Sequence, residues 1–397
     1  MERRSMHRQV FLLASSQALF QTVSVLVMTI GGLAGASITS RPELATMPIA
    51  AMFLGTALVT FPASLWMTRV GRRTGFILGA LLGAGGGFAA VAGIWIGSLL
   101  LLSLGTFFVG AYQAFAQFYR FAAGEVADDA FRPRAISFVL AGGIVAALAG
   151  PLLGRFGAGL LPVEYAGSFL LLALVSLAGA AVLMRLRIPK PGKAEKHSPP
   201  RRSWISIVRQ PAYLIALFSA ATGYGVMILA MTATPLAMVH HNHSLATAAT
   251  VIQFHVLGMF LPSFVTGSLV ARFGVVKVML AGVAILAGHV LMTLTGTGTG
   301  SFAGALILLG IGWNFLYIGG TTLLTTTYTN VERGRAQATN DMTIFAVGLA
   351  SSLGASALLQ AFGWQLLNVF LLPWLAVAAG LLIWLGHTRR RHDLLAT

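Results

Sequence analysis

The chain has no cysteine and very few charged side chains. Without cysteine, disulfide bonds and thiolate metal sites are excluded. Charged residues make up 9% of the chain, and only 10 of its 397 residues are aspartate or glutamate, whereas 57% are hydrophobic. With a mean hydropathy of +0.83, this composition excludes an ordinary soluble domain and leaves room for many apolar spans of about 20 residues.

Lysine and arginine are concentrated in the short segments between alternate apolar blocks. If Met1 is cytoplasmic, all of the 26 basic residues except Arg41 and Arg155 lie on the inner side. This positive-inside pattern predicts a multi-pass protein of a bacterial inner membrane with both termini in the cytoplasm. The net charge of +16 therefore faces anionic membrane lipid rather than nucleic acid.

We expect an all-α integral membrane fold of twelve transmembrane helices. The apolar blocks are continuous runs rather than the alternating ten-residue strands of a barrel. The predicted spans are 10–34, 46–68, 75–95, 98–121, 135–155, 166–185, 211–235, 248–270, 278–297, 301–328, 337–361 and 365–386.

The chain reads as two six-helix halves, 1–186 and 211–397, joined by a basic, proline-containing linker at 187–210 that we expect to be flexible. The loop after the second span and the loop after the eighth have similar sequences around Arg69 and Arg272. Leu104-Gly105 and Leu309-Gly310 recur at nearly the same offset, which indicates a parallel duplication.

Twelve spans, a basic linker and these two loops resemble the major facilitator superfamily over essentially the whole chain. The resemblance identifies a cytoplasmic gate motif, although Thr68 and Ala271 stand where the family usually has aspartate. It also identifies a helix-five motif that resembles one associated with antiporters. The motif residues are Arg69, Gly71, Arg72, Arg73, Arg272, Gly274 and Lys277 for the gate, and Gly150, Pro151 and Gly154 for helix five.

The motif arginines lie beside helix ends, whose carbonyl groups carry partial negative charge. They either latch neighbouring helices or serve only to set the topology. Since the usual aspartates are absent, Glu125, Asp128, Asp129 or Glu332 are alternative partners. The glycines of helix five permit close helix packing, and an antiport role for them rests on the resemblance alone.

Polar residues recur on one face of three spans, at helical spacing. Family members use helices one, four, seven and ten to line the central path, so we expect these side chains to line a substrate cavity; hydrogen bonding between helices is the alternative. Trp313 either stacks on a planar substrate or packs in the core. Arg120 either attracts an anionic substrate or extends to the cytoplasmic surface. The cavity candidates are Gln17, Gln21, Gln113, Gln117, Trp313, Asn314, Tyr317 and Thr321.

Two ionisable residues inside the spans are candidates for proton coupling, Asp341 and His255. Each could instead have a structural role, as we expect for His289. The histidines at 240, 241 and 243 form no convincing metal site because no acid or cysteine lies nearby.

We therefore expect a secondary transporter that moves a small organic solute by alternating access, coupled to protons, without a cofactor and as a monomer. Export of drugs or metabolites and uptake of a polar nutrient or cofactor both remain open. No ATP-binding motif and no clustered acid–histidine site occurs, so we do not expect an enzyme. A transport-inactive sensor on the same fold is the non-transport alternative.

Overall fold

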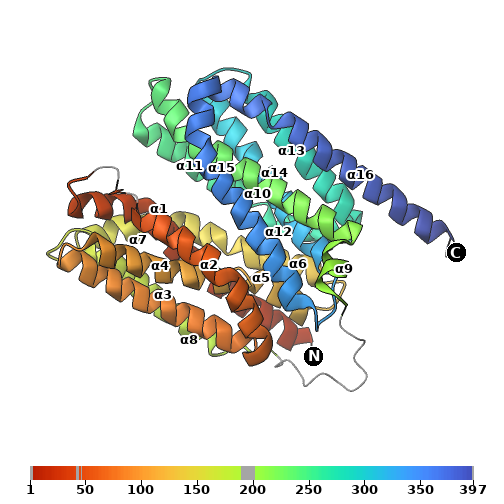
Figure 1. Ribbon diagram of the computed structural model, residues 1–397, viewed down its shortest axis with the longest axis horizontal. Helices are drawn as coiled ribbons and strands as arrows, with labels where there is room; N and C mark the ends of the chain where they lie inside the picture. Colours follow the sequence, from red (N-terminus) through yellow and green to blue (C-terminus); the bar gives the residue numbers. More distant parts are fainter. Residues whose placement is uncertain (1–2, 42–43, 46, 189–201, 396–397) are drawn as a thin grey trace. The chain divides into compact units, whose positions relative to one another are not determined.

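The computed structural model describes residues 3–41, 44–45, 47–188 and 202–395. All regular structure in this described part is helical, as expected. The helices, traced in Figure 1, are α1 (Arg3–Ile38), α2 (Met47–Val70), α3 (Arg72–Trp95), α4 (Leu99–Ala116), α5 (Tyr119–Val126), α6 (Arg132–Ala141), α7 (Gly143–Ala158), α8 (Ala166–Leu183), α9 (Trp204–Val208), α10 (Pro211–His240), α11 (Leu245–Phe260), α12 (Ser263–Phe273), α13 (Val275–Thr293), α14 (Thr299–Leu324), α15 (Arg333–Val369) and α16 (Leu372–Leu395).

The helices fall into two compact units. Unit 1 comprises Met1–Ala127, Phe138–Pro200 and Arg333–Met342, and unit 2 comprises Asp128–Ser137, Arg201–Glu332 and Thr343–Thr397. Most of unit 1 comes from the first 200 residues and most of unit 2 from the rest, and two segments are exchanged. The start of α15 belongs to unit 1, and the start of α6 belongs to unit 2.

Both units place one helix at the centre of their packing. In unit 1, α4 packs against α2 and α3, and in unit 2, α14 packs against α10, α11 and α13. Glycine makes the closest of these contacts possible: a Cβ atom on Gly110 would lie 1.9 Å from the carbonyl oxygen of Met52 on α2. Small residues allow such backbone approach within a membrane. The repeated pattern of neighbours agrees with the duplication that the sequence indicates.

Several predicted spans are interrupted in the structure. The fourth span is divided into α4 and α5 at Gln117–Phe118, the fifth at Gly142, and the eighth immediately before α12, where Pro262 is the N-cap. Proline lacks the backbone N–H that would continue the helix ladder. The first helix also extends beyond the predicted span in both directions.

The predicted linker is only partly described. Residues 189–201 lie outside the described residues, so its predicted flexibility is not addressed there. Its last part forms the short helix α9, whose N-cap Ser203 accepts a hydrogen bond from Ser206 N. This part of the linker is helical, and its cap satisfies a backbone N–H of the first turn.

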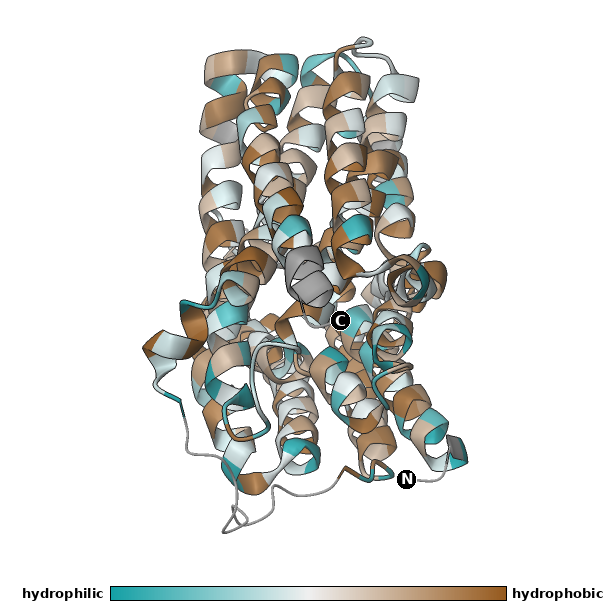
Figure 2. Ribbon diagram, turned by 90° about the vertical axis from the view of Figure 1, so that its right-hand side faces the viewer, coloured by the Kyte–Doolittle hydropathy of each residue, from teal (hydrophilic) through white to brown (hydrophobic). Residues whose placement is uncertain are grey.

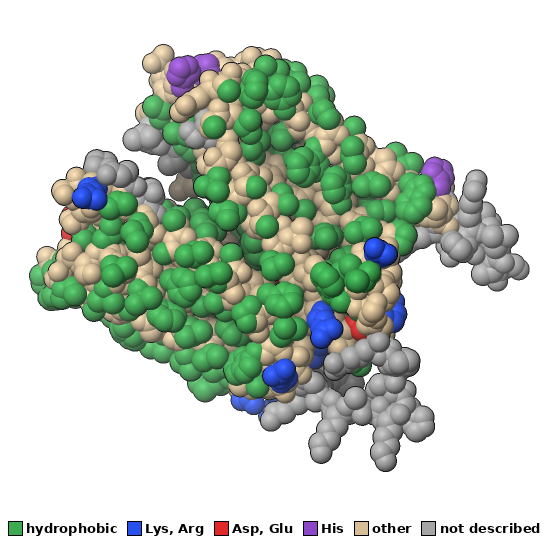
Figure 3. Space-filling view, viewed as in Figure 1, with side chains coloured by type: hydrophobic (Ala, Val, Ile, Leu, Met, Phe, Trp, Pro, Cys, Tyr) green, Lys and Arg blue, Asp and Glu red, His purple; other side chains and the backbone are tan. Residues whose placement is uncertain are grey.

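Eleven helical stretches among the described residues are long and apolar enough to cross a membrane. The last, Ala357–Thr388, runs from the end of α15 into α16. The predicted span 337–361 is not counted separately, and it contains the polar start of α15. Apolar residues colour much of each helix in Figure 2. On the face in Figure 3, hydrophobic side chains cover most of the surface, and lysines and arginines are few.

Candidate functional site

A buried ion pair joins two predicted site helices in unit 1. Arg120, on α5, donates a 2.6 Å hydrogen bond from Nη2 to Asp341 Oδ1, on α15. The side chains are only 2% and 1% exposed. Arg120 Nη1 also donates to Gln117 Oε1 at 3.1 Å. The suggestion that Arg120 extends to the cytoplasmic surface is therefore wrong, because its guanidinium group is buried and engaged with a carboxylate.

Arg72 of the gate motif is the centre of a second, largely buried cluster in unit 1. Arg72 Nη2 donates to Glu125 Oε1 at 2.7 Å, and Arg333 Nη1 donates to Glu125 Oε2 at 3.0 Å. Gln337 accepts from Arg72 and donates to the same carboxylate. Glu125 thus stands in for the missing aspartate as the acid that pairs with the motif arginine. Charge-assisted hydrogen bonds of this kind are stronger than neutral ones.

The remaining gate residues have different surroundings. Gly71 and Gly274 have φ angles of 93° and 87°, which glycine adopts far more readily than other residues. Arg73 donates to the carbonyl of Met184. Arg272 lies over the ring of Phe273, 5.2 Å from its centroid. Exposed members of the motif are Arg69, Arg73, Arg272, Gly274 and Lys277.

Each gate loop packs against a segment that comes from the other half of the sequence. In unit 1, Ser64 donates to the carbonyl of Gly334 at 2.9 Å. In unit 2, Ser137 accepts a 3.1 Å hydrogen bond from Gly267 N and donates to the carbonyl of Ser263. The start of α15 and the start of α6 are thereby fixed by equivalent contacts in the two units.

The helix-five motif packs against α1 in unit 1. A Cβ atom on Gly150 would lie 2.7 Å from Val25 Cβ, and one on Gly154 would lie 3.1 Å from Ile30 Cγ2. Pro151 lies between them within α7. These contacts support close packing, the structural alternative that the sequence left open.

The polar faces of α1 and α4 are also in unit 1. Gln17, 7% exposed, donates from Nε2 to Gln21 Oε1 at 3.3 Å, so these two amides bind each other across one helical turn. Gln113 is 7% exposed, and its buried Oε1 has no hydrogen-bond partner in the described part of the chain.

An aromatic cluster forms around α14 in unit 2. Trp313 stacks on Tyr317 with ring centroids 4.8 Å apart and an angle of 17° between the planes, and Phe260 meets Trp313 edge-on at 5.9 Å. The ring centroid of Tyr224, on α10, lies 6.3 Å from that of Tyr317 and 5.7 Å from that of Phe345. Sequence reasoning missed Tyr224, although an aromatic in the middle of the seventh span was a usable signal. Thr321, which follows Tyr317 on α14, is also buried.

Asn314 has a different environment from its neighbours on the predicted stripe. Its Nδ2 donates to Met259 O at 2.7 Å and to Ser263 Oγ at 2.6 Å, and its Oδ1 accepts from Thr266 Oγ1 at 2.7 Å. The side chain is fully buried. Because both amide hydrogens are used within unit 2, the geometry favours a packing role over the expected contact with substrate.

The two histidines of the spans both hold α14. His255 Nδ1 lies 2.9 Å from Leu306 O, and His289 Nδ1 lies 2.9 Å from Ala305 O. His289 Nε2 also contacts Asn368 Oδ1 at 3.0 Å. Both rings are fully buried. This arrangement favours the structural alternative for His255 and agrees with the one expected for His289.

An ion pair joins Arg202, in the described part of the linker, to Glu332 in the loop before α15. Arg202 donates from Nη2 to Glu332 Oε2 at 2.6 Å and from Nε to Oε1 at 2.9 Å, and Thr329 N donates to the same carboxylate. The hydrogen bonds from Arg202 lower the pKa of Glu332 to about 2 and raise that of Arg202. Since Glu332 is 3% exposed, this pair orders the segment leading into α9.

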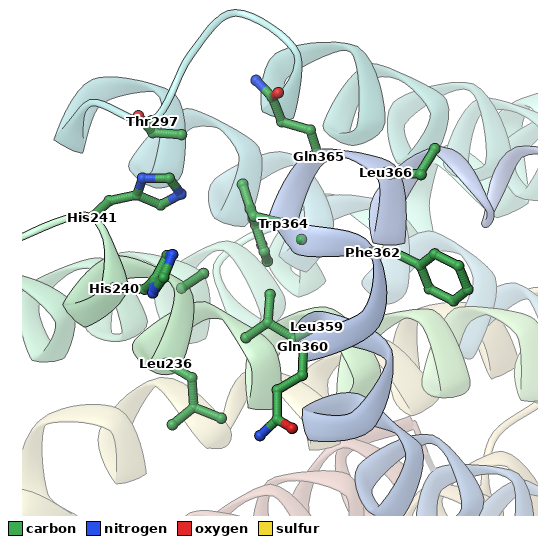
Figure 4. A pocket seen from close by; sticks show the side chains of 12 residues that line it. Leu236, His240, His241, Thr297, Leu359, Gln360, Phe362, Trp364, Gln365 and Leu366 are labelled. Carbon is green, nitrogen blue, oxygen red and sulfur yellow. The ribbon is translucent and has the colours of Figure 1, made fainter.

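A hollow of about 670 Å³ lies in unit 2, where α10 ends and α15 turns at Gly363. Figure 4 shows His240 and His241 beside Trp364 in this hollow. None of the predicted site residues lines it. His243 contacts Thr297 O at 2.7 Å. Among the described residues no group of three histidine, aspartate or glutamate side chains could hold a metal ion.

The similarity to known proteins extends over nearly the whole chain. The profile of the Major Facilitator Superfamily matches residues 10–261 and 222–396. The riboflavin transporter RfnT of Brucella anthropi is 41% identical over 373 residues, which cover 93% of this chain and 94% of that protein. The uncharacterized MFS-type transporter YdeG of Bacillus subtilis is 28% identical over 396 residues, 94% and 92% of the two chains.

Solved structures match the fold at low sequence identity. The fucose:proton symporter FucP of Escherichia coli has a TM-score of 0.75 at 16% identity, covering 94% of this chain and 98% of its own. The human organic anion transporter MFSD10 has a TM-score of 0.76 at 14% identity, covering 95% and 99%. These similarities confirm the expected twelve-helix transporter fold.

Proposed function

The chain belongs to the Major Facilitator Superfamily, and from its similarity to a riboflavin transporter we propose that it carries riboflavin, or a closely similar neutral flavin, across the bacterial inner membrane. The family and its relatives establish a multi-pass membrane transporter of a small molecule and confirm that the chain is not an enzyme. The observation that carries the flavin proposal is the 41% identity, over 93% of the chain, with a protein named a riboflavin transporter.

The aromatic cluster of unit 2 supports a planar substrate. Trp313 and Tyr317 already stack nearly parallel, and Phe260 and Tyr224 surround them. A flavin ring is flat, and aromatic rings favour offset-stacked and edge-on contacts. Trp313 Nε1 is buried without a partner in the described residues, so it can donate to a ring carbonyl or ring nitrogen of such a substrate.

We favour uptake over the export alternative. Amide and hydroxyl side chains suit directional hydrogen bonds to one polar heterocycle, such as the flavin for which the relative RfnT is named. The efflux interpretation therefore has no support here. In our proposal the chain works as a monomer with both termini in the cytoplasm, and the positive-inside charge pattern supports that orientation.

For coupling to protons, the geometry favours Asp341 over His255. Asp341 is a buried carboxylate with one oxygen in an ion pair and the other without a partner among the described residues. His255 instead binds a carbonyl of its neighbouring helix. We expect Asp341→Asn to weaken the dependence of transport on an imposed proton gradient. Unchanged dependence would exclude Asp341 as the coupling residue.

The direct test is riboflavin accumulation in bacterial cells that lack their own flavin transporter, followed by flavin fluorescence. Cells with the wild-type protein should accumulate riboflavin above cells with an empty vector. Trp313→Ala should reduce the rate, whereas Trp95→Ala, on an exposed tryptophan of α3, should not. The rates are divided by the amount of folded protein in the membrane.

Two outcomes would contradict the proposal at different levels. Wild-type cells that accumulate no riboflavin would show that the substrate is wrong. Normal transport by Trp313→Ala would instead leave the substrate in place and remove the aromatic cluster from its binding site.

A further inference from the structure

Six buried side-chain oxygen atoms in unit 1 have no hydrogen-bond partner within the described residues, and three of them are hydroxyl oxygens. The other three belong to amide or carboxylate groups: Gln113 Oε1, Asn340 Oδ1 and Asp341 Oδ2. Their side chains belong to residues that are 7%, 2% and 1% exposed. Buried polar atoms are nearly always hydrogen-bonded, so each exception calls for an explanation. All three are acceptors, which makes a shared donor partner the simplest one.

Asn340 and Asp341 belong to one connected set of side chains, and Gln113 lies next to a member of that set along its helix. Asn340 Nδ2 donates to Asp341 Oδ1 at 2.8 Å, and Arg120 donates to that same oxygen at 2.6 Å. Arg120 also donates to Gln117 Oε1. Gln113 lies one helical turn before Gln117, because Gln117 N donates to Gln113 O, so both side chains lie on the same face.

Chemistry fixes the orientation of the Asn340 amide in this set. An ionised carboxylate only accepts hydrogen bonds, so the amide nitrogen rather than the amide oxygen must face Asp341. The oxygen of Asn340 then remains as an unpartnered acceptor, as does Asp341 Oδ2. The side chains around Arg120 therefore present acceptors to a ligand, and the guanidinium group itself is already bonded.

We propose that these three oxygens, named here the acceptor cluster, bind the hydroxyl hydrogens of the substrate's polyol chain. The inference rests on the proposed function, because riboflavin carries a chain of hydroxyl groups on its flat ring. Hydroxyl groups are donors, whereas a phosphate ester brings further acceptors and negative charge. The cluster thus selects the free polyol over its phosphorylated form and over a flavin that lacks the chain.

The size of the expected discrimination follows from general energetics. A site built to hydrogen-bond a hydroxyl group rejects the analogue that lacks it, since buried acceptors are then left unpaired. One hydrogen bond corresponds to roughly a tenfold change in affinity. With three acceptors, riboflavin should bind at least about tenfold more tightly than a flavin without the chain.

The experiment measures binding to the purified full-length chain by quenching of flavin fluorescence. The probes are riboflavin, lumiflavin, which has a methyl group in place of the polyol chain, and riboflavin 5′-phosphate. For the wild type we expect riboflavin to bind most tightly. Gln113→Met keeps the length of the side chain and removes the oxygen. It should weaken the binding of riboflavin roughly tenfold and leave the binding of lumiflavin unchanged.

Gln9→Met is the matched control. Gln9 is also a buried glutamine of unit 1, but its Oε1 already accepts from Arg187 N at 2.7 Å. The Gln9→Met variant should not change the ratio of the affinities for riboflavin and lumiflavin. Equal binding of the two flavins by the wild type would overturn the inference, and this result needs no variant to fold. If Gln113→Met weakens the binding of both flavins equally, the inference would also be overturned.

Failure of the proposed function gives a different result. If the wild type binds none of the three flavins, the substrate class is wrong and the acceptor cluster has lost its proposed ligand. If the wild type binds riboflavin and lumiflavin equally, the flavin proposal stands and only the role of the acceptor cluster is removed.

Discussion

Replacing Asn314 with alanine should destabilise unit 2 rather than remove a substrate contact. The amide joins α14 to α11 and α12 through Met259 O, Ser263 Oγ and Thr266 Oγ1, at 2.6 to 2.7 Å. Alanine loses all three hydrogen bonds at once. Thr266 Oγ1 retains its 2.9 Å bond to Pro262 O, so one of the three partners is left satisfied.

The expected loss follows from that geometry. Hydrogen bonds between side chains in membrane helices contribute about 0.6 kcal/mol each on average, which gives roughly 2 kcal/mol for three. The Met259 carbonyl and the Ser263 hydroxyl then lose a partner in a buried site, and an unsatisfied buried group costs about 1–3 kcal/mol. Two such groups cost about 2–6 kcal/mol together, so we expect the free energy of unfolding to fall by about 2–6 kcal/mol.

The assay is denaturant unfolding of the purified protein in detergent, paired with riboflavin transport per folded molecule in liposomes. Asn330→Ala, at an exposed loop position, is the control and should leave both quantities unchanged. Asn314→Ala should lose stability and retain transport per folded molecule. A variant as stable as the wild type that no longer transports would refute this reasoning and restore Asn314 to the substrate site.

Arg120→Met and Asp341→Leu should each lower the free energy of unfolding by roughly 3–5 kcal/mol, because each leaves one buried charge unpaired; the double variant should recover much of this loss in the same unfolding assay. The arginine hydrogen bonds that lower the pKa of Glu332 to about 2 stabilise the folded state above the unfolded pKa near 4.5 and lose that effect as pH falls from there towards 2. Melting temperatures of the wild type should therefore approach those of Glu332→Gln over this range, and parallel curves would contradict the assignment. Gly274→Ala should cost about 1–3 kcal/mol in thermal unfolding, since φ is 87° and alanine is strained there.

The architecture could be predicted because the bilayer imposes simple rules on sequence. Apolar runs must be long enough to cross it, and basic loops remain inside. These rules place α2, α3, α8 and α14 within a few residues of their observed bounds. They do not locate the break at Pro262 or the shared packing at the starts of α6 and α15. Those features depend on contacts between residues far apart in sequence.

The pairing of charges shows where sequence reasoning reaches its limit. Glu125 could be named as an acid available to the gate motif, but nothing in its spacing pairs it with both Arg72 and Arg333. Arg120 and Asp341 are 221 positions apart, and no local pattern connects them. Their pairing is decided by how α5 and α15 pack within unit 1, which hydropathy and charge patterns do not report.

Helical periodicity identifies residues that share a face without telling what that face contacts. Asn314 and Tyr317 belong to one predicted stripe, yet the amide of Asn314 is fully used by two neighbouring helices and Tyr317 lies in the aromatic cluster. Gln113 is a glutamine like Gln17, but the Gln17 amide donates to Gln21, whereas the buried Gln113 Oε1 has no partner among the described residues. Hydrogen-bond accounting therefore separates residues that the stripe treats alike: a satisfied polar group holds helices together, whereas a buried unsatisfied one is explained best by a ligand.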